Sequence, residues 1–241
     1  MNAQALRERL FATSPCGGVA MAINGHPVVM RASGALWLPL ERMLIVADLH
    51  FEKGSAYAAR GQLLPPYDTA ETLSRLEAEV ASVSPATLVF LGDSFHDGLA
   101  EDRLAGVDAA RIAALAAGRT LVWAVGNHDA DGPRALPGDL ADELAVGSLV
   151  LRHEPLPDRQ PGEVAGHLHP CARLVGRGRA VRRRCFATDG ERVILPAFGA
   201  YAGGLNIRDT AFKGLFVRPP LAVALGKDRA HPLSWAMLGG D

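Results

Sequence analysis

The chain has 241 residues, of which 49% are hydrophobic and 21% are charged, and its formal net charge is −1. These values indicate a globular protein with a sizeable core. No apolar run approaches the roughly 18 to 20 residues that span a bilayer, which excludes a membrane-spanning protein.

The N-terminal stretch is charged at positions 7–9 and has no hydrophobic segment, so we expect no secretory signal and a cytoplasmic location. Three separate cysteines without a C-x-x-C pair argue against a disulfide framework and a cysteine zinc knuckle; they are Cys16, Cys171 and Cys185. Residues 1–170 carry 13 basic and 21 acidic side chains, whereas residues 171–241 carry 12 and 5. This basic C-terminal part favours an anionic partner.

The expected elements alternate between strands and helices. Apolar runs on both sides of Asn24-Gly25 predict a β-hairpin, and two more strands are expected at 34–39 and 42–48. A helix is predicted over 65–83 with Asp68 and Glu71 as a capping box, then a strand at 86–93. A second helix over 101–118 ends at Gly118 and precedes a strand at 120–127. Later strands are expected around 144–152, 163–166, 172–185, 191–197 and 214–217.

Strands alternate with helices in the middle of the chain, which implies a parallel arrangement, and the ends add antiparallel strands. The sequence therefore predicts an α/β sandwich of two packed sheets. With no clear linker, residues 1–241 are expected to form a single domain.

Polar residues gather where the apolar segments end. Each presumed central strand, and two later ones, runs directly into histidine, aspartate or asparagine. The carboxyl ends of neighbouring parallel strands share one edge of a sheet, where ligands bind. The residues in question are Asp48 and His50; Asp93, His96 and Asp97; Asn127, His128 and Asp129; His153; and His167 and His169.

Histidines and carboxylates on one edge indicate a metal site. Imidazole, carboxylate and amide ligands without thiolate favour Mn, Fe or Zn. More than four candidate ligands point to two ions, which a carboxylate such as Asp93 can bridge. Two cations activate a water between them and hold phosphate oxygens, while a free histidine protonates the leaving oxygen. The pattern thus favours metal-assisted phosphoester hydrolysis.

The ordered motifs D-x-H (48–50), G-D (92–93), G-N-H-D (126–129), a lone histidine (153) and G-H-x-H (166–169) resemble the calcineurin-like metallophosphoesterase superfamily. The resemblance implies a four-layer α/β/β/α sandwich in which two mixed sheets are flanked by helices. It implies two divalent metal ions, Mn²⁺ first with Fe or Zn as alternatives. One ion would bind Asp48, His50 and His169; the other would bind Asn127, His153 and His167; and Asp93 would bridge them.

By the same resemblance, His128 acts near the scissile phosphate and Asp129 orients it. Many relatives read G-D-x-x-D, whereas this chain has His96 at the position of the second aspartate, so His96 is expected to contact substrate.

Longer stretches, such as 46–69 and 195–204, are similar to the bacterial ligase-associated DNA damage response endonucleases. This likeness implies a phosphodiesterase or nuclease in DNA repair, with an ATP-dependent DNA ligase, a helicase and an exonuclease as functional partners.

The arginine-rich stretch 177–185 can contact a phosphate backbone, with Arg182 and Arg183 as the expected contacts, or can form a solvated hairpin rim. The motifs alone leave three functions open. A nuclease and a phosphatase or phosphodiesterase for a small nucleotide-like phosphoester would use the same site. A non-catalytic scaffold would be free to lose ligands, and this chain retains all those expected.

Overall fold

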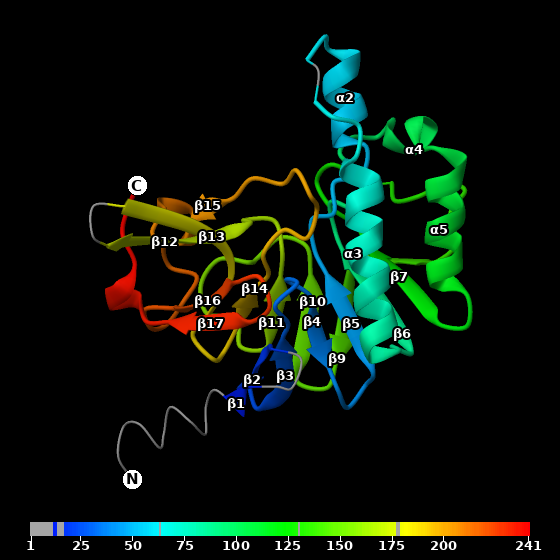
Figure 1. Cartoon of the computed structure of the whole chain (residues 1–241). Helices are drawn as coiled ribbons and strands as arrows, with labels where there is room; N and C mark the ends of the chain where they lie inside the picture. Colours follow the sequence, from blue (N-terminus) through cyan, green and yellow to red (C-terminus); the bar gives the residue numbers. More distant parts are fainter. Residues whose placement is uncertain (1–11, 14–16, 63, 130, 177–178) are drawn as a thin grey trace.

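The computed structural model describes residues 12–13, 17–62, 64–129, 131–176 and 179–241. Two β-sheets pack face to face, and the two longer helices cover the outer face of one of them (Figure 1). Cys16 and Arg177 lie outside the described residues. Among those described, no helix combines the length and the apolar character needed to cross a membrane.

The first sheet is mixed. Its strands follow chain order, and they pair antiparallel from β1 to β5 and parallel from β5 to β8. The strands are β1 (Ala12–Thr13), β2 (Val19–Ile23), β3 (His26–Met30), β4 (Leu36–Leu38), β5 (Met43–Val46), β6 (Thr87–Leu91), β7 (Thr120–Ala124) and β8 (Asp139–Ala141). The predicted hairpin is β2–β3, in which Ile23 faces His26 across Asn24 and Gly25, both at positive φ.

The second sheet is also mixed, with the order β15-β12-β13-β14-β11-β10-β9, while β16 pairs with β13 and β17. Its β10 and β11 run parallel, so the segments after both leave the same edge. The strands are β9 (Glu143–Val146), β10 (Leu149–Arg152), β11 (Glu163–Ala165), β12 (Pro170–Gly176), β13 (Arg179–Thr188), β14 (Val193–Ile194), β15 (Leu205–Asn206), β16 (Leu221–Leu225) and β17 (Ala230–Leu233).

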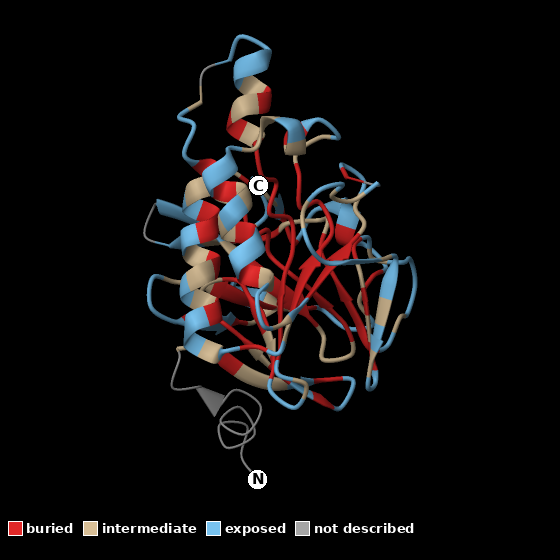
Figure 2. Cartoon of the chain, turned by 90° about the vertical axis from the view of Figure 1, so that its right-hand side faces the viewer, coloured by how far each residue is buried: buried red, intermediate tan, exposed pale blue. Residues whose placement is uncertain are grey.

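The helices lie mainly between strands of the first sheet. They are α2 (Lys53–Ala59), α3 (Asp68–Val83), α4 (Ala100–Arg103) and α5 (Gly106–Ala116), with short 3₁₀ turns η1 (Thr210–Phe212) and η2 (Trp235–Met237). The buried positions concentrate on the strands between the helices and the second sheet (Figure 2). Helix α2 instead projects beyond the sheet edge (Figure 1).

Alternation along the strands creates two cores around the first sheet. On β5, Leu44 and Val46 face α3 and α5, whereas Met43 and Ile45 face the second sheet. Phe186 on β13 enters the core between the sheets from the other side. The predicted sandwich of two mixed sheets is thereby confirmed. On the outer face of the second sheet, 3₁₀ turns and loops carry the covering residues Ile207, Phe212, Leu215 and Leu238.

Three local expectations were wrong. The helix expected over 101–118 is interrupted, because Leu104 and Ala105 adopt extended backbone with ψ of 125° and 139°. Asp68 does not cap its own helix; its carboxylate accepts the N–H of Gly54 at 2.9 Å, which ties α3 to α2. Residues 214–217 contain a turn and a bend instead of a strand, with Gly214 at φ of 84°, and the strand follows only after Pro219 and Pro220.

Candidate metal centre

The polar residues after the strands meet at one edge of the sandwich. Strands β5, β6 and β7 deliver Asp48, Asp93 and His128 from the first sheet, and β10 and β11 deliver His153 and His167 from the second. A parallel bridge between Ala47 and Ala197 joins the two sheets at this edge. The two sheets therefore meet where their ligand-bearing segments emerge.

The first cluster contains Asp48, His50 and His169, whose ligand atoms all lie within 4.8 Å of one another. The Nε2 atoms of His50 and His169 are 3.2 Å apart, and His169 Nε2 is 3.3 Å from Asp48 Oδ1. Asp48 and His50 are buried. Two imidazole nitrogens and a carboxylate thus face one small volume.

The second cluster contains Asp93, His153 and His167 within the same limit. His153 Nε2 is 3.3 Å from Asp93 Oδ1 and 3.3 Å from His167 Nδ1. On its other side, His153 Nδ1 is 3.8 Å from Asp48 Oδ1. Since His153 touches carboxylates of both groups, the two clusters are immediate neighbours, as a dinuclear centre requires.

The backbone at most of these ligands is strained. Non-glycine residues seldom adopt positive φ, and such outliers gather at functional sites. The residues are Asp48 (φ 56°), His50 (47°), Asp93 (47°), His167 (66°) and His169 (45°). At each of these five residues, the left-handed backbone directs the side chain toward the shared edge of the two sheets.

Hydrogen bonds between the strand ends hold this conformation. The N–H groups of Asp48 and His50 donate to the carbonyls of Gly92 and Asp93, at 3.2 and 2.9 Å. The N–H of His167 donates to the Asp48 carboxylate at 3.1 Å. A side chain at Gly92 would collide with the imidazole of His153, which explains the glycine before Asp93.

The electrostatics of the two clusters differ. Burial, reinforced by neighbouring His169, lowers the pKa of His50 to about 3, so this imidazole is neutral. Burial would also lower the pKa of His153, but Asp93 and Asp48 outweigh it and raise the pKa to about 9. The two carboxylates therefore create a strongly negative potential that draws a positive charge.

The donor set fits two divalent cations. Imidazole nitrogens and carboxylate oxygens converge in each cluster, the ligand combination preferred by Zn, Fe and Mn. The negative potential at His153 is the environment that a cation would neutralise. Asp93 Oδ1 contacts His153 of the same cluster and also accepts the N–H of His128 at 3.0 Å, so the second cluster adjoins the segment that carries His128.

His128 stands beside the clusters with its side chain 48% exposed. Its Nδ1 is 2.9 Å from the carbonyl oxygen of His96, and a carbonyl can only accept, so Nδ1 carries the hydrogen. Its Nε2 faces the site, 3.9 Å from Asp93 Oδ2. The ring is therefore oriented to exchange a proton with a group at the clusters.

The hydrogen bonds of Asp129 differ from the expected one to His128. Its carboxylate accepts the backbone N–H groups of Ser94, Phe95 and Gly126, at 2.7, 3.1 and 3.1 Å, and no hydrogen bond to the His128 ring is found among the described residues. Burial raises the pKa of Asp129. The residue thus joins the segments after β6 and β7, while the carbonyl of His96 orients His128.

Two more expected site residues lie at the rim. Asn127 is exposed and lines a cavity of about 290 Å³ together with Gly126, Arg152 and His153, beside the second cluster. The ring of His96 stacks on His128, with centroids 5.7 Å apart and planes at 17°. Both therefore lie next to the converging ligands.

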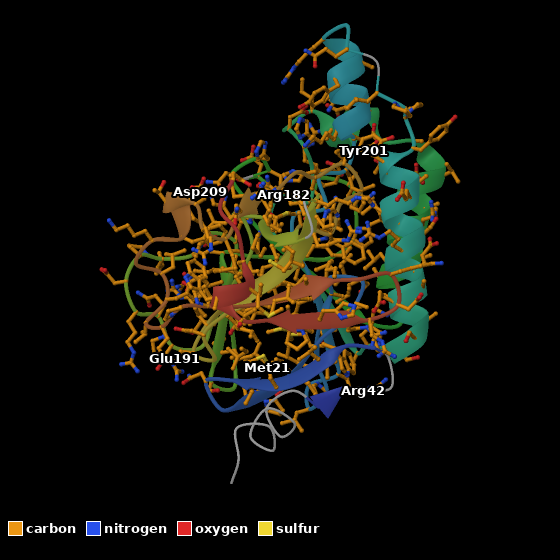
Figure 3. The ribbon with its side chains drawn as sticks, turned by 60° about the vertical axis from the view of Figure 1, so that its left-hand side comes forward. Met21, Arg42, Arg182, Glu191, Tyr201 and Asp209 are labelled. Carbon is orange, nitrogen blue, oxygen red and sulfur yellow. The ribbon has the colours of Figure 1, made fainter. Side chains whose placement is uncertain are left out.

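Among the described residues of the arginine-rich stretch, the side chains divide between the two faces of β13. On β13, Arg182 and Arg184 reach the 197–204 segment, where Arg182 donates to the carbonyl of Gly204 at 2.6 Å. Arg183 lies on the opposite face, beside Ala172 of the outer core, and so is separated from Arg182. Figure 3 shows Arg182 and Tyr201 on the side from which α2 projects.

Arg184 has a structural role that its sequence context did not reveal. Its guanidinium donates to the carbonyls of Ala197, Ala200 and Ala202, at 3.1, 3.0 and 2.8 Å. The segment so held donates the N–H of Gly199 to the Asp48 carbonyl at 3.1 Å. The only available signal was strand alternation, which places Arg182 and Arg184 on one face and Arg183 on the other.

Comparisons with known proteins agree with this geometry. A family model described as calcineurin-like phosphoesterase matches residues 41–184. The crystal structure of Pseudomonas putida nuclease MPE is similar, with 29% identity and a TM-score of 0.69, over 90% of this chain and 100% of that chain. The motif-based resemblance is thereby confirmed.

A second solved structure, that of Yfce, a phosphoesterase from E. coli, matches with 16% identity and a TM-score of 0.40 over 80% of this chain and 98% of that chain. No curated protein matches the chain.

Proposed function

The chain belongs to the calcineurin-like phosphoesterase family, and we propose that it hydrolyses phosphodiester bonds of DNA with two divalent cations, preferably Mn²⁺. The observation that carries this proposal is the pair of adjacent clusters, Asp48–His50–His169 and Asp93–His153–His167. Asn127 at the rim would complete the second. Fe or Zn would suit the same ligands.

Each group in the site would then have a defined task. When bound, the two ions polarise the phosphate oxygens and activate the attacking water. His128, whose Nδ1 is held by the His96 carbonyl, would present a protonated Nε2 to the leaving oxygen. Asp129 would keep the segments after β6 and β7 in register through its three backbone contacts.

A nucleic-acid substrate is supported by two observations. The similar solved structure is that of a nuclease. The C-terminal part of the chain is basic, and Arg182 lies next to the segment that follows His169. A DNA substrate would fit the expected cytoplasmic location. It would also fit the repair context that the resemblance implies, with a DNA ligase, a helicase and an exonuclease as functional partners.

The test is a substrate comparison with Mn²⁺-loaded protein. Single-stranded DNA, duplex DNA and bis-p-nitrophenyl phosphate are incubated separately, and products are measured by gel and by absorbance. Cleavage of at least one DNA supports the proposal. Turnover of the chromogenic diester with both DNAs intact would instead favour a small nucleotide-like phosphoester as substrate.

A further inference from the structure

Helix α2 places an aromatic residue beside the candidate metal centre. The helix begins at Lys53, three residues after the cluster histidine His50, and its Glu52 cap has a positive φ of 64°. This turn directs the helix away from the sheet edge, so α2 projects from the rest of the molecule (Figure 1). The partly buried Tyr57 lies on this helix.

The rings form a continuous row from the clusters to the helix. His50 meets His128 edge-on at a centroid distance of 5.4 Å, and His128 stacks on His96 at 5.7 Å. His96 in turn lies 5.9 Å from the Tyr57 ring, with planes at 38°. The row therefore connects the proton-exchanging histidine to a side chain outside the metal centre.

Hydrogen bonds hold the backbone segments that carry these rings. The N–H of Gly54 donates to the Asp68 carboxylate at 2.9 Å, and Arg103 Nε donates to Ser55 Oγ at 3.0 Å. The N–H of His96 donates to the Phe51 carbonyl at 3.0 Å, which ties the two ring-bearing segments together. The arrangement is thus held by both neighbouring helices.

Basic side chains gather on the α2 side of His128. Lys53 and Arg60 stand about one helical turn before and after Tyr57, so the three residues share one face of α2. On the other side, a cavity of about 250 Å³ is lined by Asp97, Glu101 and Asp131 together with Arg134, and Asp97 and Glu101 are paired with arginines. A polyanion that reaches His128 is attracted to the α2 side.

We propose that the Tyr57–His96 row binds the nucleobase next to the scissile phosphate, while Lys53 and Arg60 attract the adjoining phosphates. This inference rests on the proposed nuclease function. A base offers a flat face to aromatic rings whatever its identity, so such a surface selects nucleic acid without reading its sequence. A small phosphoester without a base gains nothing from it.

The test compares two Mn²⁺-dependent substrates of equal length, a single-stranded oligothymidylate and its fully abasic analogue. An aromatic chromogenic ester is unsuitable here, because its own ring can stack on Tyr57. We expect wild type to prefer the base-bearing strand, and the ratio of the two kcat/KM values to fall about tenfold in Tyr57→Ala. Tyr57→Phe should retain the ratio.

The matched control is Tyr67→Ala, since Tyr67 is an exposed tyrosine on the connection to α3, outside the row, and should leave the ratio unchanged. Metal content and melting temperature are measured for every variant. Equal cleavage of both strands by wild type, or an unchanged ratio in Tyr57→Ala, overturns the base-binding row but not the nuclease. Wild type that cleaves no strand yet hydrolyses bis-p-nitrophenyl phosphate overturns both.

Discussion

Left-handed backbone at Asp48, His50, Asp93, His167 and His169 gives the candidate centre its geometry. Such a residue turns the chain sharply after a strand, so its side chain points across the sheet edge. Strain of this kind persists only where neighbouring contacts over-determine it. Here the carboxylate of Asp48 receives the N–H of His167, and one ligand thereby fixes another.

Residue types were predictable at this scale, but their partners were not. The D-x-H, G-D and G-H-x-H patterns and the lone histidine at 153 identified the cluster residues from sequence. Asp129 follows His128 directly, yet its carboxylate turns toward three backbone N–H groups on other segments. Side-chain direction in a turn depends on φ and ψ, which the sequence pattern does not specify.

Replacing His128 by alanine should reduce diester turnover by about 10² to 10⁴-fold, because the leaving oxygen loses its proton donor. Metal content should stay at the wild-type value, since the His128 ring belongs to neither cluster. The measurements are steady-state kinetics and metal analysis. His231→Ala is the matched control, because His231 is an exposed residue on β17 and belongs to neither cluster. Wild-type turnover in His128→Ala would contradict the assigned role.

At the scale of elements, the 197–204 segment supports the first cluster through the backbone of Asp48. Arg184 holds three of its carbonyls, and its Gly199 contacts the Asp48 backbone. Contacts of this kind orient ligands and commonly contribute 10- to 100-fold in metal affinity.

Arg184→Ala should therefore weaken Mn²⁺ binding by about 10-fold or more in a metal titration followed by calorimetry. Arg183→Ala, one residue away on the opposite face, should leave the affinity unchanged. Equal losses in the two variants would mean that the anchored segment is not what supports the site.

Helix α4 anchors the segment that flanks His128. Glu101 accepts the backbone N–H groups of Arg134 and Ala135, at 2.8 and 2.9 Å. Burial acts to raise the pKa of Glu101, but these two donors and the Arg134 guanidinium outweigh it and lower the pKa below its ordinary value. A depressed folded-state pKa contributes stability above the unfolded pKa, and this contribution is lost as the pH falls.

Glu101→Gln should therefore lower the free energy of unfolding by about 1 kcal/mol at pH 7. The difference from wild type should shrink as the pH falls below about 4.3, where the carboxylate of the unfolded chain becomes protonated. Urea unfolding at several pH values measures this difference in the free energy of unfolding. A deficit that stays constant down to pH 3 would contradict the ionic origin.

The long apolar periods predicted α3, α5 and the central strands, whereas short elements escaped prediction. Helix α2 has only seven residues, and its start depends on the positive φ of Glu52, which no local pattern indicates. Strand β16 follows a Pro-Pro pair, whereas a strand was expected at 214–217, and β17 was not predicted. The pairing of β16 with β13 is a long-range contact that the sequence pattern alone does not reveal.

On the scale of the whole molecule, one core lies between the two sheets and draws side chains from both. We propose on this basis that residues 1–241 behave as one domain. Parallel neighbours β5, β6 and β7 followed from the strand–helix alternation. Only the resemblance predicted that the second sheet would bring its histidines to the same edge, namely His153, His167 and His169. The packing of one sheet against the other depends on the whole chain, so no local sequence pattern indicates it.

Removal of metal should destabilise this whole unit. A ligand at about 1,000 times its Kd contributes roughly 4 kcal/mol per site, and each kcal/mol shifts Tm by about 2–4 °C in a chain of this size. EDTA should then lower Tm by at least roughly 10 °C while unfolding remains a single transition in calorimetry. Two separate transitions would contradict the single domain, and an unchanged Tm would contradict tight metal binding.

The most direct measurement is the number of Mn²⁺ ions per chain by native mass spectrometry, for wild type and for Asp48→Asn. Asparagine tolerates left-handed backbone and can still accept the N–H of His167, so this variant changes charge while the fold is retained. The two-cluster account predicts two ions in wild type and one in Asp48→Asn. Fewer than two ions in wild type, or two in the variant, would contradict it.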